Sequence, residues 1–167
     1  IAECLGVTKM SVTRCFDELE YLEMPLLTMK GKSRVISMNG DPKEQWEEIH
    51  SMLRNPVIAT FEITEDLNLD VKAGMSALCE YSMLEDNPFP TYAITKKEIQ
   101  TLQIKKKQLV PKGEEKGCVI QELGYYINFQ KRNLVDPLTV LLSLSDEEKA
   151  DDRVRISIEE MLKEYVW

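Results

Sequence analysis

Apolar residues recur at helical spacing in short blocks of the chain, and glycine or proline separates the blocks. Residues 1–5 have the pattern of the last part of a helix, which Gly6 interrupts. A second helix is expected to run to about residue 23, because Thr8 or Ser11 offers the hydroxyl that caps a helix start. The pattern therefore predicts a helix, a turn and a second helix at the start of the chain.

The next block changes from helical spacing to alternation. Pro25 ends the second helix, because the residue before a proline is kept out of the helical region. Residues 26–38 then predict two short strands joined as a hairpin. Asp41 followed by Pro42 is a cap with proline at the first helical position, which begins another helix. That helix closes the first predicted domain, residues 1–57.

The second predicted domain, residues 58–167, alternates between strand-like and helix-like segments. Strands are expected at residues 59–64, 91–95 and 119–128. Helices are expected at residues 71–84 and 96–102, after Asp136 with Pro137, and after Asp151 with Asp152, whose charges suit a helix start. The predicted fold class is therefore α+β, and the second domain mixes helices with short strands.

Composition places the chain among globular proteins and removes several classes of function. Hydrophobic residues make up 43% and charged residues 30%, and no apolar run is long enough to cross a membrane. The four cysteines form no C-x-x-C pair and only one histidine could assist them, so we expect no metal site. We expect the thiols to be reduced and mostly buried, as in a cytoplasmic protein. The cysteines are Cys4, Cys15, Cys79 and Cys118. The chain starts within a helical pattern, and we expect that the first helix of the first domain precedes Ile1.

The chain is acidic, with a net charge of −8 and an isoelectric point of about 4.8. Proteins that coat nucleic acid without sequence preference need clustered lysine and arginine to neutralise phosphates, so this acidity disfavours such a role. Sequence-specific binding needs only a local basic face. Any nucleic-acid interface is therefore expected to be confined to one part of the chain.

No set of residues requires an enzyme. The chain has no glycine-rich phosphate loop, and its single histidine, His50, is expected to be a packed or edge residue beside Trp46. The acidic residues of segment 66–70 lack the glycine and distal glutamate of a calcium loop, and we expect a solvated turn there. The lysines at 105–107 are expected to form a charged surface. We predict no catalytic residues and no cofactor.

The first two predicted helices match a DNA-binding helix-turn-helix. Ala2 is small where the two helices would cross, and Gly6 suits a turn with a positive φ angle. Val12 and Cys15 are expected to face inward and to hold the second helix in place. The residues left outward suit a helix end that enters the major groove and contacts base edges, phosphates or a thymine methyl. They are Thr8, Lys9, Met10, Ser11, Thr13 and Arg14.

The predicted hairpin adds further cations. Lys30, Lys32 and Arg34 are expected to alternate onto one face, around a tip that Gly31 allows to turn. Such a hairpin would be a wing that reaches the neighbouring groove or the DNA backbone, although a solvated loop can have the same composition. The carboxylates late in the second helix must then face away from the duplex. They are Asp17, Glu18, Glu20 and Glu23.

Several stretches resemble known regulators. The first part of the chain resembles winged helix-turn-helix regulators of the MarR-like kind, at residues 5–14 (LGVTKMSVTR) and 16–19 (FDEL). The C-terminal region of AbiEi-type antitoxin regulators is similar to five further stretches, so that the resemblance covers nearly the whole chain. These stretches are residues 74–84 (GMSALCEYSML), 92–94 (YAI), 135–144 (VDPLTVLLSL), 152–154 (DRV) and the closing Trp167. The shared motifs are mostly structural.

The resemblance implies a winged helix-turn-helix that binds double-stranded DNA, followed by a mixed α+β domain. It implies a transcriptional repressor, and more narrowly the antitoxin of an abortive-infection pair whose partner is a nucleotidyltransferase-like toxin. The DNA contacts then fall on Lys9, Ser11, Thr13 and Arg14 of the second helix and on Lys30, Lys32 and Arg34 of the hairpin. The C-terminal region lacks the Gly-Ser and paired-aspartate pattern of an active nucleotidyltransferase, so a fold of that kind would be inactive.

Other functions stay open at this point. The alternative to DNA binding is a protein-interaction module in which the winged helix holds a partner. A nucleotide-dependent enzyme and a ligand-sensing regulator are two further alternatives. The oligomeric state also stays open, because the sequence contains no heptad seam of the kind that would join two chains.

Overall fold

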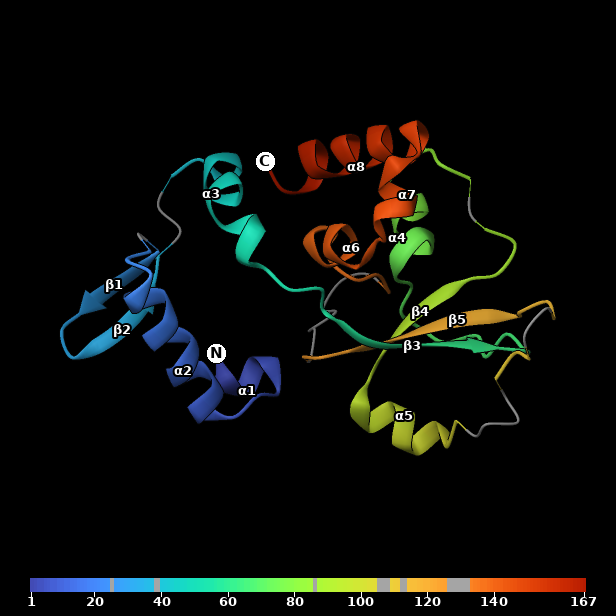
Figure 1. The fold of residues 1–167 in the computed structure, drawn as a ribbon, viewed down its shortest axis with the longest axis horizontal. Coiled ribbons are helices and arrows are strands. Elements are labelled where there is room, and N and C mark those ends of the chain that lie inside the picture. The colour runs from blue at the N-terminus through green and yellow to red at the C-terminus, as the bar shows by residue number, and fades with distance from the viewer. Residues whose placement is uncertain (25, 38–39, 86, 105–108, 112–113, 126–132) are drawn as a thin grey trace. The chain divides into compact units, whose positions relative to one another are not determined.

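The computed structural model describes residues 1–167 except 25, 38–39, 86, 105–108, 112–113 and 126–132 (Figure 1). Pro25, the lysines at 105–107 and the end of the strand expected at 119–128 lie outside the described residues. Backbone contacts divide the chain into two compact units, called here the N-terminal unit (Ile1–Leu53, with Trp167) and the C-terminal unit (the described residues between Arg54 and Val166). Both contain helices and strands, which confirms the α+β class.

The boundary between the units falls before Arg54, whereas the sequence pattern placed it after residue 57. Pro56 belongs to the C-terminal unit, because its carbonyl accepts a hydrogen bond of 2.9 Å from the Gly124 amide. This bond ties the segment before the first strand of that unit to the end of its central strand.

The N-terminal unit begins with two helices, α1 (Ala2–Leu5) and α2 (Lys9–Tyr21). Gly6 joins them with φ of 64°, a left-handed conformation that glycine adopts without a side-chain clash. Thr8 caps α2, since its hydroxyl oxygen accepts a 3.1 Å hydrogen bond from the Ser11 amide. The helix, turn and second helix predicted at the start of the chain are thus present. The second helix ends before the expected residue 23, where Glu23 has φ of 52°.

A two-stranded hairpin follows, formed by β1 (Leu27–Lys30) and β2 (Ser33–Ile36). The two strands are antiparallel, and Gly31 at φ 64° is the first of the two residues that join them. Hairpin loops of two residues favour glycine at this position, because the turn needs a positive φ there. The hairpin predicted from alternation is therefore present.

The register of the hairpin corrects one expectation about its cations. Lys30 pairs with Ser33, and Met29 pairs with Arg34. Cross-strand partners share a face of the ladder and adjacent residues alternate, so Lys30 and Arg34 lie on opposite faces. The expectation that Lys30, Lys32 and Arg34 share one face is wrong. Alternate residues share a face only within one strand, and the turn at residues 31–32 separates Lys30 of β1 from Arg34 of β2.

Helix α3 (Pro42–Ile49) completes the regular structure of the N-terminal unit, together with the short 3₁₀ helix η1 (His50–Met52). Asp41 caps α3 and Pro42 occupies its first turn, as the sequence pattern predicted. The Asp41 carboxylate accepts hydrogen bonds from the amides of Lys43 at 2.8 Å and Glu44 at 3.2 Å.

The C-terminal unit is built on a three-stranded sheet with the order β3-β5-β4. The strands are β3 (Val57–Ile63), β4 (Thr91–Thr95) and β5 (Cys118–Leu123). The central strand β5 runs antiparallel to β3 and parallel to β4. Because β5 has a partner on both sides, it forms the buried middle of the unit.

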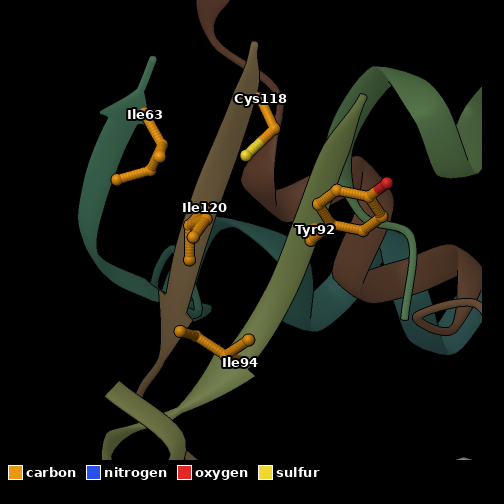
Figure 2. Close-up of a cluster of buried hydrophobic side chains, with 5 residues drawn as sticks. All are labelled: Ile63, Tyr92, Ile94, Cys118 and Ile120. Carbon is orange, nitrogen blue, oxygen red and sulfur yellow. The ribbon is translucent and has the colours of Figure 1, made fainter. Parts of the chain in front are cut away.

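One face of this sheet carries a compact hydrophobic cluster (Figure 2). Its buried members are Ile63, Tyr92, Ile94, Cys118 and Ile120. Ile99 of α5 (Lys96–Leu102) packs against the cluster, and α5 lies on this side of the sheet in Figure 1. The capping box of Thr95 and Glu98 begins α5 directly after β4, at the residue where the sequence pattern predicted it.

On the other side of the sheet, α4 (Gly74–Tyr81) contacts β4, and α6 (Pro137–Ser143) and α8 (Asp152–Tyr165) pack against α4. Helix α7 (Asp146–Ala150) lies between α6 and α8 in the sequence. Helix α4 lies close to the sheet, where the Ser76 hydroxyl accepts a 2.9 Å hydrogen bond from the Thr91 amide. Asp136 and Asp151 cap α6 and α8, in agreement with the sequence. Helix α7 was not expected.

Two further expectations are corrected by the structure. Residues 71–73 were assigned to a helix, but they are extended beside β4, where the Ala73 amide donates to the Thr91 carbonyl at 2.9 Å. The thiols are not mostly buried, because Cys4 and Cys15 are exposed, Cys79 is half-buried and only Cys118 is buried.

Every helix in the described parts of the chain is too short or too polar to cross a membrane.

Candidate nucleic-acid interface

The interface expected from the sequence begins at the N-terminal end of α2, where three hydroxyls already have local partners. The Thr8 and Ser11 hydroxyls hydrogen-bond to each other at 2.9 Å, and the Thr13 hydroxyl donates to the Lys9 carbonyl at 3.1 Å. These bonds hold the first turns of the helix in one conformation. A hydroxyl that contacts a phosphate here has to share or exchange its present bond.

The cations and the thioether at this end of α2 are open to solvent. Lys9 and Arg14 are exposed, and the Met10 side chain is 64% exposed. The first turn of α2 contains no carboxylate, so the positive end of the helix dipole is not neutralised there. Together these features make the start of α2 a local basic surface on an acidic protein.

The inner side of α2 explains why these residues point outward. Phe16 is buried with 8% of its surface exposed, and Val12 and Leu19 are partly buried at helical spacing on either side of it. Arg14 lies about half a turn from Phe16 around the helix. Cys15 was expected to face inward, but it is exposed, because Phe16 takes the position that packs against the rest of the unit.

Arg34 of the hairpin reaches α2 rather than solvent. Its guanidinium donates to the Asp17 carboxylate at 2.5 Å and to the Glu20 carboxylate at 3.4 Å, and it lies 5.5 Å from the centre of the Phe16 ring. The hydrogen bond that Arg34 donates to Asp17 is the main cause of the raised pKa of Arg34. Only a quarter of the Arg34 side chain is exposed, so it is engaged within the unit rather than free to meet DNA.

The remaining cations of the hairpin lie at its tip. Lys30 ends β1 and Lys32 follows Gly31 in the turn, and both are exposed. The structure therefore separates the three hairpin cations that the sequence grouped together. Two are available at the tip, and the third pairs with the carboxylates of α2.

Sequence reasoning missed one residue of this surface. Tyr21 is 86% exposed at the end of α2, and it follows Arg14 by seven residues and Met10 by eleven. Residues at this spacing share one face of a helix, so Met10, Arg14 and Tyr21 lie along one exposed ridge, which also includes Asp17. The signal was the helical spacing of positions 10, 14, 17 and 21. Met10 and Arg14 were predicted as DNA contacts, whereas Asp17 was expected to face away from the duplex and instead shares their ridge.

The other candidate residues already have local hydrogen-bond or stacking partners, or do not cluster. The His50 ring stacks on Trp46 with 5.9 Å between ring centres, and its Nδ1 lies 3.0 Å from the Glu47 carbonyl oxygen. In segment 66–70 the Asp66 carboxylate accepts a 2.9 Å hydrogen bond from the Asn68 amide and a 3.0 Å bond from the Tyr92 hydroxyl. In the part of the chain that the structure describes, no three histidine, cysteine or acidic residues come together as a metal site.

Three comparisons with known proteins give no relative that could identify this surface. The sequence matches no protein-family model. Neither the curated proteins nor the solved structures provide a match. The interpretation of the N-terminal unit therefore depends on its own geometry.

Proposed function

We propose that this protein is a DNA-binding transcriptional regulator that acts as a repressor, and that α2 is its recognition helix. The observation that supports the proposal is the charge distribution along α2. Lys9 and Arg14 are exposed near its start, whereas Asp17 and Glu20 near its end are paired with Arg34. In this proposal the N-terminal unit is a winged helix-turn-helix, with the hairpin as its wing.

The arrangement fits entry of the start of α2 into a major groove. Arg14 has the planar group that can form two hydrogen bonds with a guanine edge, and the exposed Met10 can contact a thymine methyl. Lys30 and Lys32 at the hairpin tip suit phosphate oxygens. Arg34 reduces the repulsion that Asp17 and Glu20 would exert on the DNA backbone. The acidic remainder of the chain repels DNA and so disfavours non-specific binding. The affinity for DNA then comes from this local basic surface.

The test is binding of the complete chain to DNA from upstream of its own gene, measured by mobility shift and by fluorescence anisotropy. We expect Arg14→Ala to weaken specific binding by about 1–3 kcal/mol if Arg14 contacts a base. Lys32→Ala should weaken binding to all sequences alike and lower the dependence on salt by about one phosphate contact. Arg155→Ala, an exposed arginine of α8, is the matched control and should change neither.

An unchanged affinity in the Arg14→Ala, Lys32→Ala double variant would exclude this placement of the interface. Loss of binding in the Arg155→Ala control would mean that DNA meets the C-terminal unit instead.

A second candidate function is a protein-interaction module, and the exposed apolar side chains of α2 favour it. Met10 and Tyr21 lie on one ridge with exposures of 64% and 86%, and tyrosine is enriched at protein interfaces. This function predicts that Tyr21→Ser abolishes capture of a stoichiometric partner while Arg14→Ala leaves it intact. It also predicts no DNA shift at low salt.

The antitoxin role that the sequence resemblance implies is a narrower form of the same proposal. It predicts that co-expression with the product of the adjacent gene relieves that product's toxicity, and that the two proteins purify together. A regulator without a toxin partner would repress its own promoter and show neither effect.

A further inference from the structure

The C-terminal unit contains a cavity of about 560 Å³ at the edge of its sheet, whereas the surface proposed to bind DNA belongs to the N-terminal unit. Cavities between about 300 and 1,000 Å³ are the usual size of small-molecule sites. Six of its eight lining residues are polar or charged or carry a hydroxyl. The described lining residues are Asn68, Leu69, Asp70, Lys72, Glu80, Tyr92, Asn133 and Leu134.

The backbone around this cavity is fixed by hydrogen bonds between segments far apart in the sequence. Lys72 donates from its amide to the Asn133 carbonyl at 2.9 Å and accepts at its carbonyl from the Val135 amide at 3.0 Å. The Ala93 amide of β4 donates to the Val71 carbonyl at 2.9 Å. These bonds extend the sheet beyond β4 and fix the backbone at Lys72 between β4 and residues 133–135. The wall of the cavity is therefore preformed.

One wall of the cavity is a charged pair beside an aromatic ring. The Lys72 ammonium lies 2.5 Å from the Glu80 carboxylate of α4. Tyr92 is buried, and its hydroxyl donates to Asp66. Tyr92 is both a member of the hydrophobic cluster and a lining residue of the cavity, and Figure 2 shows its ring extending from β4 away from Ile63.

The other wall presents polar side chains without internal partners. Among the described residues, the Asp70 carboxylate and the side-chain amides of Asn68 and Asn133 have no hydrogen-bond or ion-pair partner. All three residues are exposed at the mouth of the cavity. A carboxylate flanked by amides can accept from an ammonium and exchange hydrogen bonds with hydroxyls.

We propose that this cavity binds a small hydroxylated organic amine. Glu80 is paired with Lys72, so among the described lining residues the remaining charge is the Asp70 carboxylate, which favours a cation over an anion. The amides of Asn68 and Asn133 are placed to bind hydroxyls. Asp70 holds the amine, and the Tyr92 ring gives the carbon skeleton an apolar surface. The site is independent of the proposed DNA interface.

The experiment uses three probes with the same six-carbon chain, which differ only at C1, where they carry an ammonium, a hydroxyl or a carboxylate: 1-amino-1-deoxysorbitol, sorbitol and gluconate. Binding of each to the full chain is followed by amide chemical shifts and by thermal stabilisation, which rises with the concentration of a ligand that binds the folded state. We expect saturable shifts at residues 68–72 and 133–135 with the amine. Sorbitol should bind about tenfold or more weakly, and gluconate more weakly still.

Asp70→Asn separates this site from general charge attraction. Asp70 is exposed and unpaired among the described residues, so the variant is expected to fold. It should bind the amine no better than sorbitol, while Glu159→Gln, which removes an exposed carboxylate on α8, should keep the preference. The proposal is overturned if no probe gives a saturable shift, if gluconate binds as well as the amine, or if Asp70→Asn keeps the preference.

Discussion

Arg34 joins the hairpin to α2 through three contacts, two with carboxylates and one with an aromatic ring. Its guanidinium meets Asp17, Glu20 and the face of Phe16. An exposed ion pair contributes little to stability by itself, because water already solvates both partners. The consequence of this cluster is therefore positional and electrostatic, since it holds the hairpin against the acidic end of the helix and pairs Asp17 and Glu20 with a cation.

This position leads to a prediction about salt dependence. Arg34→Ala should weaken DNA binding, because it exposes Asp17 and Glu20, but it should leave the slope of affinity against salt unchanged. Lys32→Ala should lower that slope, since a phosphate contact releases a counterion. Titrations at several salt concentrations separate the two effects. If Arg34→Ala lowers the slope as Lys32→Ala does, Arg34 leaves the carboxylates and contacts a phosphate in the complex.

The cysteines should differ in reactivity according to their burial. Burial raises the pKa of the Cys118 thiol, and its Sγ donates to the Glu65 carbonyl at 3.2 Å. We expect Cys4 and Cys15 to react rapidly with a thiol reagent, and Cys118 to react only when the unit opens. Mass spectrometry of the labelled peptides checks this order. Rapid labelling of Cys118 in the native protein would contradict the described packing of β5.

The raised pKa of Cys118 also gives a dependence on pH. A thiol whose folded pKa lies above its unfolded value stabilises the fold fully below the unfolded pKa, about 8.5. That contribution is lost as the pH rises through the folded pKa. Stability should therefore fall on the alkaline side, and Cys118→Ala should flatten this part of the profile, measured by urea unfolding at a series of alkaline pH values.

At the scale of elements, two glycines with different surroundings should tolerate alanine differently. A Cβ at Gly117 would lie 2.5 Å from the Glu65 carbonyl carbon, a backbone atom that cannot turn aside. A Cβ at Gly31 would meet nothing within 4 Å, so only its φ of 64° is strained. We expect Gly117→Ala to cost about 1–3 kcal/mol or more and Gly31→Ala about 1 kcal/mol.

Urea unfolding followed by circular dichroism compares the two variants. A loss of stability for Gly31→Ala that equals or exceeds the loss for Gly117→Ala would contradict the close approach of β5 to the segment after β3.

Elements set by neighbouring residues were predictable from the sequence, and those set by distant contacts were not. The caps at Thr8, Asp41 and Asp136 act within one helical turn, and each was identified. The capping box of Ser145 and Glu148 was also present as a local signal for α7 and was overlooked. By contrast, residues 71–73 have a helical apolar pattern but pair with β4 and with residues 133–135, and no local pattern contains such pairs.

The same division applies to the candidate interface. Helical spacing predicts which residues at the start of α2 face outward, and Lys9 and Arg14 were identified in this way. The engagement of Arg34 could not be predicted, because it depends on the register of the hairpin and on a contact with a helix seventeen residues away in the sequence.

At the scale of the whole molecule, the two units differ in how much they bury. Among the described hydrophobic residues of the N-terminal unit, only Phe16 and Leu26 are buried, and many others are exposed. The C-terminal unit buries residues on both faces of its sheet, including Ile120 at 0% exposure. Because apolar burial is the main favourable term in folding, the N-terminal unit should have the lower free energy of opening.

Hydrogen exchange followed by mass spectrometry tests this difference and the division into units. In the unmodified protein, amides of β1 and β2 should exchange faster than those of β4 and β5. Phe16→Ala removes about 3–5 kcal/mol of packing, enough to open the N-terminal unit, and it should leave exchange in β5 unchanged. Ile120→Ala, at a cost of about 2–5 kcal/mol, should accelerate exchange in β4 and β5 alone. If either variant accelerates both units equally, the chain opens as one cooperative body. In that case the DNA surface of α2 would depend directly on the stability of the sheet, and a ligand in the cavity beside Lys72 would stabilise both.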